Sequence, residues 1–290
     1  CIGAKGDEII ITAGATESIN LAFSGREGHV VTSAIEHHAV LEASKRHDAT
    51  IVPVRPDGMV GPDVIAQAIR PDTWLVSIAL ANHELGTVQR IREISEIVAR
   101  ERNRRMEAGE TTPIYLHSDA SQGAGQLDIN VARLGVDMLT LNAAKMYGPK
   151  QVGLLWMSSN VRMQPLIVGG GQERGLRSGT ENVAGTIGFA RALELVTEHR
   201  NSEVKRLGEL RDHLQRRLLE AFPDAIISGS TKRRLSGHLH ISFPGIDAER
   251  IVFALEVRNV LVATGSACAA NKGKFSHVLM AIGVEEPVAN

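Results

Sequence analysis

The stretch EIIITAGATES, residues 8–18, contains the pattern that decides the fold. A short apolar run predicts a strand over residues 8–12, Gly14 predicts a turn, and the pattern that follows predicts a helix over residues 17–23. The same order of strand and helix recurs along the chain. Alternating strands and helices favour an α/β fold with a doubly wound, mostly parallel sheet covered by helices on both faces.

The repeated pattern gives the bounds of the expected elements. Strands are predicted over residues 8–12, 29–33, 51–54, 74–80, 114–117, 138–141 and 152–156, and helices over 17–23, 37–46, 62–69 and 90–105. Near residue 190 the pattern changes to a long amphipathic helix around 204–218, strands over 225–227, 239–243 and 260–263, and a helix over 248–257. We therefore expect a large domain at 1–190 and a smaller α+β domain at 191–290.

The composition is that of a soluble globular protein, with 43% hydrophobic and 22% charged residues. A formal net charge of −1 argues against a general attraction to nucleic acid, and no apolar run of about 18 residues predicts a membrane span. Two cysteines are too few for a disulfide scaffold and fit a cytoplasmic protein. The charge run at 99–109 predicts a solvated helix end. The start at Cys1, without a methionine, predicts a partial sequence.

Three segments of the first half carry side chains suited to chemistry. Gly14, Ala15 and Thr16 stand where a strand meets a helix, and free amides there bind anions. Asp119 ends an apolar strand, where it either pairs with a protonated ring nitrogen or caps the next helix. Lys145 lies between an apolar strand and a Gly-Pro turn, where desolvation favours Schiff-base chemistry, although a surface lysine is the simpler interpretation.

Three further features complete the set. The glycine-rich run at 169–180 carries arginine and hydroxyl donors that suit phosphate or carboxylate, or else it is a linker. Cys268 stands among small residues and lysines, a setting that favours a reactive thiolate. His37 and His38 are a poor metal pair, but one of them can stack on a ring or move protons. Together these are the parts of a pyridoxal phosphate site: an anion cradle, a carboxylate for the pyridinium, a Schiff-base lysine and a nucleophile.

Six motifs in one order carry a resemblance to a known family. They are GATESIN, EHHAVL, HSDASQ, KMYGPK, GGGQERGLRSGT and GSAC. In this order they resemble the cysteine desulfurases of the NifS/IscS-like group, which belong to the class V pyridoxal phosphate-dependent aminotransferase superfamily of fold type I. The resemblance covers residues 8 to about 283, and it implies that the large domain binds the cofactor.

The resemblance also implies a role for each matching residue. Ala15 and Thr16 would hold the phosphate of the cofactor, and Lys145 would form the Schiff base. Asp119 would pair with the pyridinium nitrogen and Gln122 would bind the ring hydroxyl. His37 would stack on the ring and transfer protons. Thr180 would reach the phosphate of a neighbouring subunit, which implies a homodimer. Cys268 would attack the sulfur of the substrate and become a persulfide.

The chain departs from the family pattern at two places. His83 stands where the family has an asparagine that contacts the cofactor, and Asn142, Ala143 and Ala144 stand where it commonly has Ser-Gly-His. Asn142 keeps one hydrogen-bond donor, so we expect both His83 and Asn142 among the cofactor contacts.

The resemblance implies L-cysteine as the substrate, with L-alanine and a protein-bound persulfide as the products. The sulfur would pass to an acceptor or iron–sulfur scaffold protein, with no metal in the site and no nucleic-acid or membrane partner. Two alternatives stay open at this point. One is another class V enzyme, such as a selenocysteine lyase or an aminotransferase. The other is a cofactor-free partner in sulfur assembly, which the substitutions at His83 and Ala144 would favour.

Overall fold

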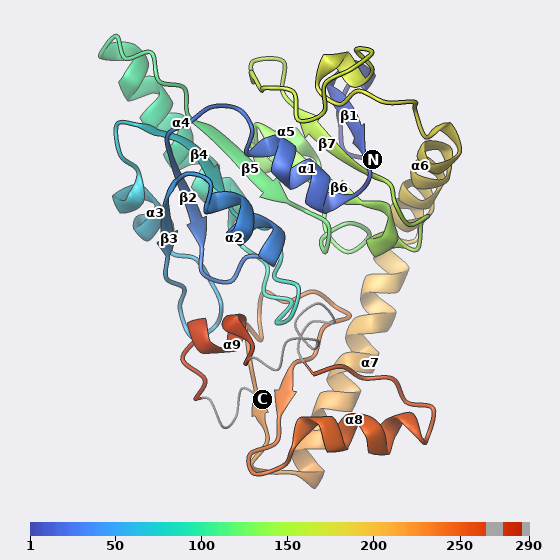
Figure 1. Ribbon diagram of the computed structural model, residues 1–290. Coiled ribbons are helices and arrows are strands. Elements are labelled where there is room, and N and C mark those ends of the chain that lie inside the picture. The colour runs from blue at the N-terminus through green and yellow to red at the C-terminus, as the bar shows by residue number, and fades with distance from the viewer. Residues whose placement is uncertain (265–274, 286–290) are drawn as a thin grey trace.

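A computed structural model describes residues 1–264 and 275–285, and a seven-stranded sheet forms its centre (Figure 1). The strands are β1 Ile9–Thr12, β2 His29–Ser33, β3 Asp48–Val52, β4 Thr73–Ser77, β5 Tyr115–Asp119, β6 Met138–Asn142 and β7 Gly153–Met157. They lie in the order β1-β7-β6-β5-β4-β2-β3. Neighbours from β3 to β6 pair in parallel, and β7 is antiparallel to both β1 and β6. The predicted mostly parallel sheet is confirmed.

Helices cover both faces of this sheet. They are α1 Ala15–Ala22, α2 His38–Ser44, α3 Pro62–Ala68, α4 Ile91–Glu107, α5 Val131–Leu134 and α6 Val183–Glu198, with short 3₁₀ turns η1 Gly6–Glu8, η2 Ala143–Met146 and η3 Glu173–Gly175. Consecutive strand residues face opposite sides. Leu75 of β4 therefore packs in the core that includes α1 and α2, whereas its neighbour Val76 packs in the core that includes α4. The doubly wound arrangement follows from this alternation.

A second region follows α6, below the sheet in Figure 1. It contains α7 Arg200–Ala221, the antiparallel pair β8 Ile226–Ile227 and β9 Ile241–Ser242, α8 Ala248–Glu256 and α9 His277–Ala281. The strand predicted over 260–263 is wrong, because these residues have no regular structure and Leu261 is 84% exposed. A strand needs a hydrogen-bonded neighbour, which an apolar pattern alone does not supply. The predicted domain boundary at 190 falls within α6 and stays a prediction.

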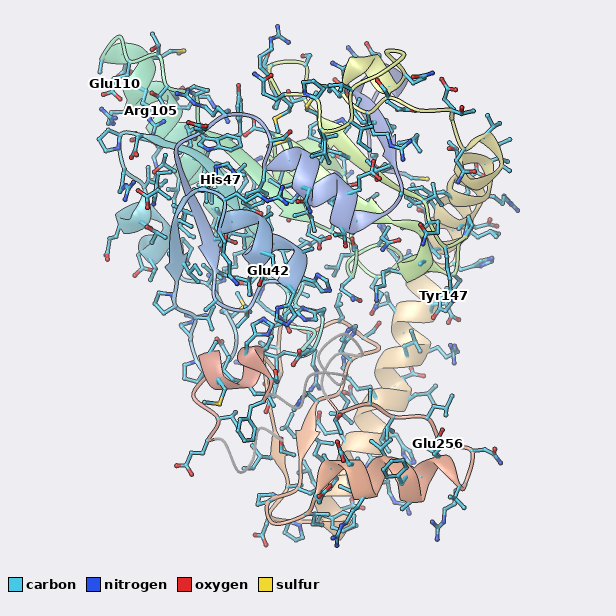
Figure 2. All side chains as sticks on the ribbon, viewed as in Figure 1. Glu42, His47, Arg105, Glu110, Tyr147 and Glu256 are labelled. Carbon is cyan, nitrogen blue, oxygen red and sulfur yellow. The ribbon has the colours of Figure 1, made fainter. Side chains whose placement is uncertain are left out.

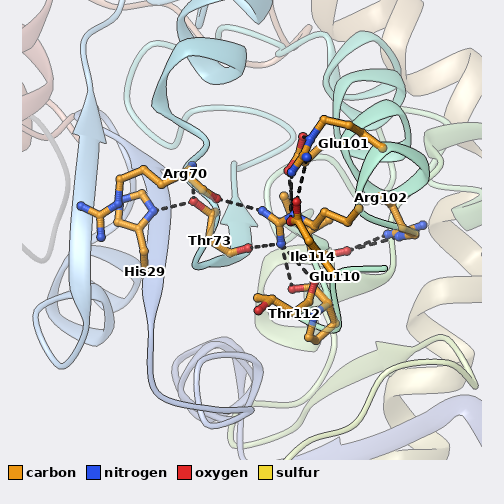
Figure 3. Close-up of polar contacts among 11 residues, drawn as sticks. His29, Arg70, Thr73, Glu101, Arg102, Glu110, Thr112 and Ile114 are labelled. Carbon is orange, nitrogen blue, oxygen red and sulfur yellow. Dashed lines mark hydrogen bonds and ion pairs between the residues drawn. The ribbon is translucent and has the colours of Figure 1, made fainter. Parts of the chain in front are cut away.

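The charge run at 99–109 is only partly a solvated helix end. Arg105 on α4 is 2% exposed, and its guanidinium donates to the carbonyls of Thr73 at 2.7 Å and Arg70 at 2.9 Å. Glu101 accepts a further bond from Arg105 Nε at 2.7 Å (Figure 3). The buried charge is thus paired and hydrogen-bonded, and it fixes the end of α4 against the start of β4. Among the described residues, no helix is both long and apolar enough to cross a membrane.

Candidate active site

The carboxyl-terminal ends of the parallel strands bring distant segments of the chain to one edge. His37 follows β2, His83 follows β4, Asp119 ends β5 and Lys145 follows β6. Asp119 and Lys145 lie close enough to His37 to shift its pKa, and His37 lies close enough to His83 to shift the pKa of that ring. Ligands of open α/β sheets bind at such an edge. The structure therefore brings together four of the residues that the sequence singles out.

A close backbone approach shapes the turn before α1. Gly14 has φ 143° and precedes the first helical residue, Ala15. A Cβ at Gly153 of β7 would lie 2.7 Å from the Cα of Gly14, so only glycine lets the two segments meet. The first amides of a helix have no partner within the helix, and Ala15 and Thr16 lie in this first turn. The turn is therefore suited to an anion, as predicted.

Asp119 is placed by its own strand and the turn that follows. Its Oδ1 accepts a hydrogen bond from the amide of Ser121 at 2.9 Å. Burial raises the pKa of Asp119, while the bond from Ser121 and the charge of Lys145 oppose this rise. A carboxylate held among these groups is suited to pair with a cation such as a protonated ring nitrogen. His117, two residues earlier, bonds only hydroxyls, Ser77 at 2.8 Å and Thr140 at 2.9 Å, and its role is structural.

His37 is the N-cap of α2 rather than a residue within the helix. Its Nδ1 accepts a hydrogen bond from the amide of Ala39 at 3.1 Å, so the proton of the neutral ring lies on Nε2. Burial lowers its pKa, the charge of Asp119 raises it, and His38 and Lys145 lower it further. A neutral ring that carries its proton on Nε2 is able to stack on a planar group and to donate or return a proton.

His83 is buried on a turn that Asn82 builds. The side-chain oxygen of Asn82 accepts from the amides of Glu84 at 2.9 Å and Leu85 at 2.8 Å, and its nitrogen donates to the carbonyl of Ile35 at 2.8 Å. Burial, with a smaller contribution from His37, lowers the pKa of His83 to about 3. The ring is therefore neutral, and its contact of 3.6 Å with Glu84 is not an ion pair. Its Nε2 is buried and has no hydrogen-bond partner within the described part of the chain.

Lys145 lies in η2, directly after β6, and its side chain is exposed. The side-chain oxygen of Asn142 accepts from the amide of Ala144 at 3.2 Å and so caps this turn. Tyr147 then takes a left-handed conformation with φ 61° and lies 96% exposed at the surface (Figure 2). The backbone around Lys145 is thus fixed, whereas its amine is free to reach a ligand.

The remaining predicted residues are less closely tied to this edge. Gln122 lies in the turn after Asp119. Thr180 is exposed on the 169–180 loop, which a bond of 2.7 Å between Arg177 and Glu17 holds against α1. Cys268 lies outside the described residues. The cofactor and catalytic roles of all these residues stay predictions.

The sequence interpretation missed the residues that attach α9 to the site. The hydroxyl of Ser276 donates to the buried Oε2 of Glu84 at 2.5 Å, and Nε2 of His277 donates to the carbonyl of Glu36 at 2.9 Å. The ring of His277 lies 4.6 Å from that of His38, centroid to centroid. Val278 and Leu279 pack in an apolar cluster with Ile35 and Leu85; none of these contacts joins residues that are near in sequence.

The groups at this edge suit pyridoxal phosphate. The glycine turn before α1 offers amides to a phosphate, and Asp119 offers a buried carboxylate to a protonated ring nitrogen. His37 offers a neutral ring, Lys145 offers an accessible amine, and His83 offers a buried nitrogen that lacks a partner. In the ranges 1–264 and 275–285, no group of three or more His, Cys, Asp or Glu is arranged to hold a metal ion.

Comparison with known proteins adds an independent finding. The family model for class V aminotransferases matches residues 1–284. The cysteine desulfurase IscS of Dictyoglomus turgidum is 42% identical over 100% of this chain and 74% of its own length. The cysteine desulfurase IscS 1 of Archaeoglobus fulgidus is 40% identical over 100% of this chain and 75% of its own length.

Solved structures show the same likeness. A NifS-like protein matches with a TM-score of 0.87 and 34% identity, over 99% of this chain and 76% of the other. A structure described as SspA in complex with cysteine matches with a TM-score of 0.78 and 33% identity, over 99% of this chain and 80% of the other.

Proposed function

This chain belongs to the class V aminotransferase family, and from that premise we propose that it is a pyridoxal phosphate-dependent cysteine desulfurase. The reaction converts L-cysteine and the thiol of Cys268 into L-alanine and a persulfide on Cys268. Atoms and electrons balance without an external oxidant, because one sulfur atom moves from carbon to sulfur and a proton replaces it. The observation that carries the proposal is the meeting of His37, Asp119 and Lys145 at one sheet edge.

The chain's own residues account for binding of the cofactor. Ala15 and Thr16 would present the first turn of α1 to the phosphate, Asp119 would keep the ring nitrogen protonated, and His37 would stack on the ring. When bound, pyridoxal phosphate withdraws electrons from the α-carbon of an amino acid. His83, Asn142 and Gln122 would supply further polar contacts to the cofactor.

Two side chains move protons in the proposed reaction. The amine of Lys145 takes the α-proton of the substrate and returns a proton to the product carbon. His37 carries its proton on Nε2, because Nδ1 is occupied by the amide of Ala39. It is therefore oriented to exchange a proton at the site, and burial keeps its ring neutral by lowering its pKa.

Sulfur transfer is assigned to Cys268. Its thiolate attacks the sulfur of the substrate, the sulfur–sulfur bond forms, and the carbon–sulfur bond breaks with its electron pair left on the carbon. The persulfide then passes sulfur to an acceptor, which we propose is an iron–sulfur scaffold or another acceptor protein in the cytoplasm. The names of the IscS relatives favour iron–sulfur assembly over other uses.

We also propose a homodimer in which Thr180 contacts the phosphate of the partner site. Its exposure on the 169–180 loop supports this arrangement. Val183 and Ile187, on the helix that begins just after it, are 63% and 65% exposed. Apolar side chains beside an exposed polar contact residue are typical of a subunit interface.

Two variants test the proposed function. Protein expressed with pyridoxal phosphate should be yellow and should release alanine and sulfide from L-cysteine in the presence of a thiol reductant. Lys145→Ala should lose the covalently bound colour, and Cys268→Ala should keep the colour but lose sulfide release. Sulfide release from Cys268→Ala at the parent rate would exclude the persulfide step. Production of a keto acid instead of alanine would indicate an aminotransferase.

A further inference from the structure

A second buried carboxyl group lies at the catalytic edge, in addition to Asp119. Glu36 is 2% exposed and follows β2 directly before His37. The hydroxyl of Ser33 bonds its Oε1 at 2.6 Å, and the amide of Ala79 donates to Oε1 at 3.2 Å and Oε2 at 3.0 Å. Ser33 ends β2 and Ala79 follows β4, so this carboxyl group joins the ends of two neighbouring strands.

Within residues 1–264 and 275–285, no cation balances the carboxyl group of Glu36. None of the ion pairs found in the described ranges involves Glu36, and the charge of Asp119 on β5 faces it. His277 on α9 bonds the Glu36 carbonyl through Nε2, and His37 is its neighbour in sequence. An unpaired buried carboxylate beside a second carboxylate is costly, so one of the two takes up a proton.

Asp119 is better suited than Glu36 to carry the negative charge. The hydrogen bond from Ser121 and the charge of Lys145 favour ionised Asp119, whereas among the described residues no positive group favours ionised Glu36. Burial, and to a smaller extent the charge of Asp119, raise the pKa of Glu36 to about 8 against the opposing effect of the bonds from Ser33 and Ala79. A short contact of 2.6 Å between Ser33 Oγ and Oε1 is compatible with a proton on either oxygen.

We propose that Glu36 is a positioning residue that keeps its proton at neutral pH, so that it joins β2 to β4 beside Asp119 without adding a second negative charge. In this role it sets the position of His37 and leaves Asp119 as the charged partner for a cationic ring. The part that concerns His37 and Asp119 rests on the proposed function. The part that concerns the proton of Glu36 does not.

The proton is tested without turnover. In the full chain expressed with pyridoxal phosphate and labelled with ¹³C at the glutamate carboxyl carbons, one resonance should titrate with a midpoint near pH 8. Glu36→Gln should remove this resonance. Glu42→Gln should leave it in place, since Glu42 lies on the following helix α2 and its side chain is 63% exposed. A Glu36 resonance that titrates near the ordinary value of 4.5 would overturn the proposal.

Unfolding provides a second measurement. The folded chain keeps the Glu36 proton from pH 4.5 to about 8, while the unfolded chain loses it near 4.5. The folded state therefore binds more protons in this window, and its stability relative to Glu36→Gln falls as the pH rises from 5 to 8 and then levels off. Urea midpoints of the two proteins that differ by a constant amount across this range would count against the proposal.

Positioning is tested by comparing two substitutions. Glu36→Gln keeps a neutral side chain of the same shape, so alanine formation at pH 7 should stay within about threefold of the parent. Glu36→Ala removes the link to Ala79, so kcat should fall by about tenfold or more. Equal kcat values for the two variants would overturn the positioning role. If the parent chain forms no alanine while Glu36 still titrates near pH 8, only the proposed function fails.

Discussion

The rings of His37 and His83 meet edge to face, with centroids 5.2 Å apart and planes inclined by 72°. One ring follows β2 and the other follows β4, so the contact exists only because these two strands are neighbours in the sheet. His37 is partly buried and the side chain of His83 is 8% exposed, and burial lowers the pKa of both rings. The pair is therefore neutral near pH 7 and forms an uncharged wall beside Asp119.

The capping bond of His37 separates its structural role from its chemical role. His37→Ala should lose the bond to the Ala39 amide and reduce the free energy of unfolding by about 1 kcal/mol. His37→Asn should retain the cap and the stability, because asparagine is a good N-cap residue. Both variants should form alanine at least about tenfold more slowly. Urea denaturation and an alanine assay check these values, and full activity of His37→Asn would show that the imidazole is not required.

Acid should destabilise the protein through His83. Its pKa is about 3 in the fold, against an ordinary value of 6.5, so the unfolded chain takes up a proton below pH 6.5 that the buried ring does not. The stability this provides is present above pH 6.5 and falls as the pH is lowered toward 3. At pH 5 the loss amounts to about 2 kcal/mol.

His83→Asn should remove this part of the acid sensitivity, whereas His213→Asn, at an exposed position on α7, should not. Urea denaturation of both variants at pH 7 and pH 5 makes the comparison. An unchanged difference between the two pH values in His83→Asn would show that the ring is protonated in the fold.

The sequence predicts the sheet well where strands are buried and poorly where they are not. The strand over 29–33 is found with the predicted bounds, and all its residues are buried. The strand predicted over 51–54 instead forms β3, Asp48–Val52, because its pairing begins opposite His29. This edge strand is largely accessible, so it has no apolar run to mark its start. Strand order and the antiparallel direction of β7 depend on contacts between distant segments, which local patterns do not contain.

The same limit applies to the site. Motifs identify His37, Asp119 and Lys145, because the chemistry of each side chain is visible in its immediate sequence. Asn82 and Glu36 act through bonds to Ile35 and Ala79, which are distant in sequence. One feature of the sequence does indicate such residues: a polar run follows each apolar strand, and the ends of parallel strands meet at one edge of the sheet.

Gly153 should be essential for the turn before α1, which we propose binds the cofactor phosphate. An added Cβ would lie 2.7 Å from the Cα of Gly14 and 2.8 Å from the carbonyl oxygen of Leu141, and neither backbone segment is free to move aside. Gly153→Ala should destabilise the fold by roughly 1–3 kcal/mol and weaken cofactor binding. Gly6→Ala is the control, since no atom lies within 4 Å of a Cβ there. Absorbance titration with pyridoxal phosphate and urea denaturation give both values, and equal behaviour of the two variants would contradict the close approach.

Ser276 should decide whether α9 stays attached to the site. Its hydroxyl donates to Glu84 Oε2 at 2.5 Å and accepts from the amide of Leu279 at 3.2 Å. Ser276→Ala leaves a buried carboxylate oxygen without its donor, at a cost of about 1–3 kcal/mol, whereas Ser276→Thr keeps the hydroxyl. Because α9 has only five residues, the loss should appear locally, as faster amide hydrogen exchange at Ile282 and Val284 in the alanine variant. Equal exchange in the two variants would mean that the apolar contacts of Val278 and Leu279 hold α9 without this bond.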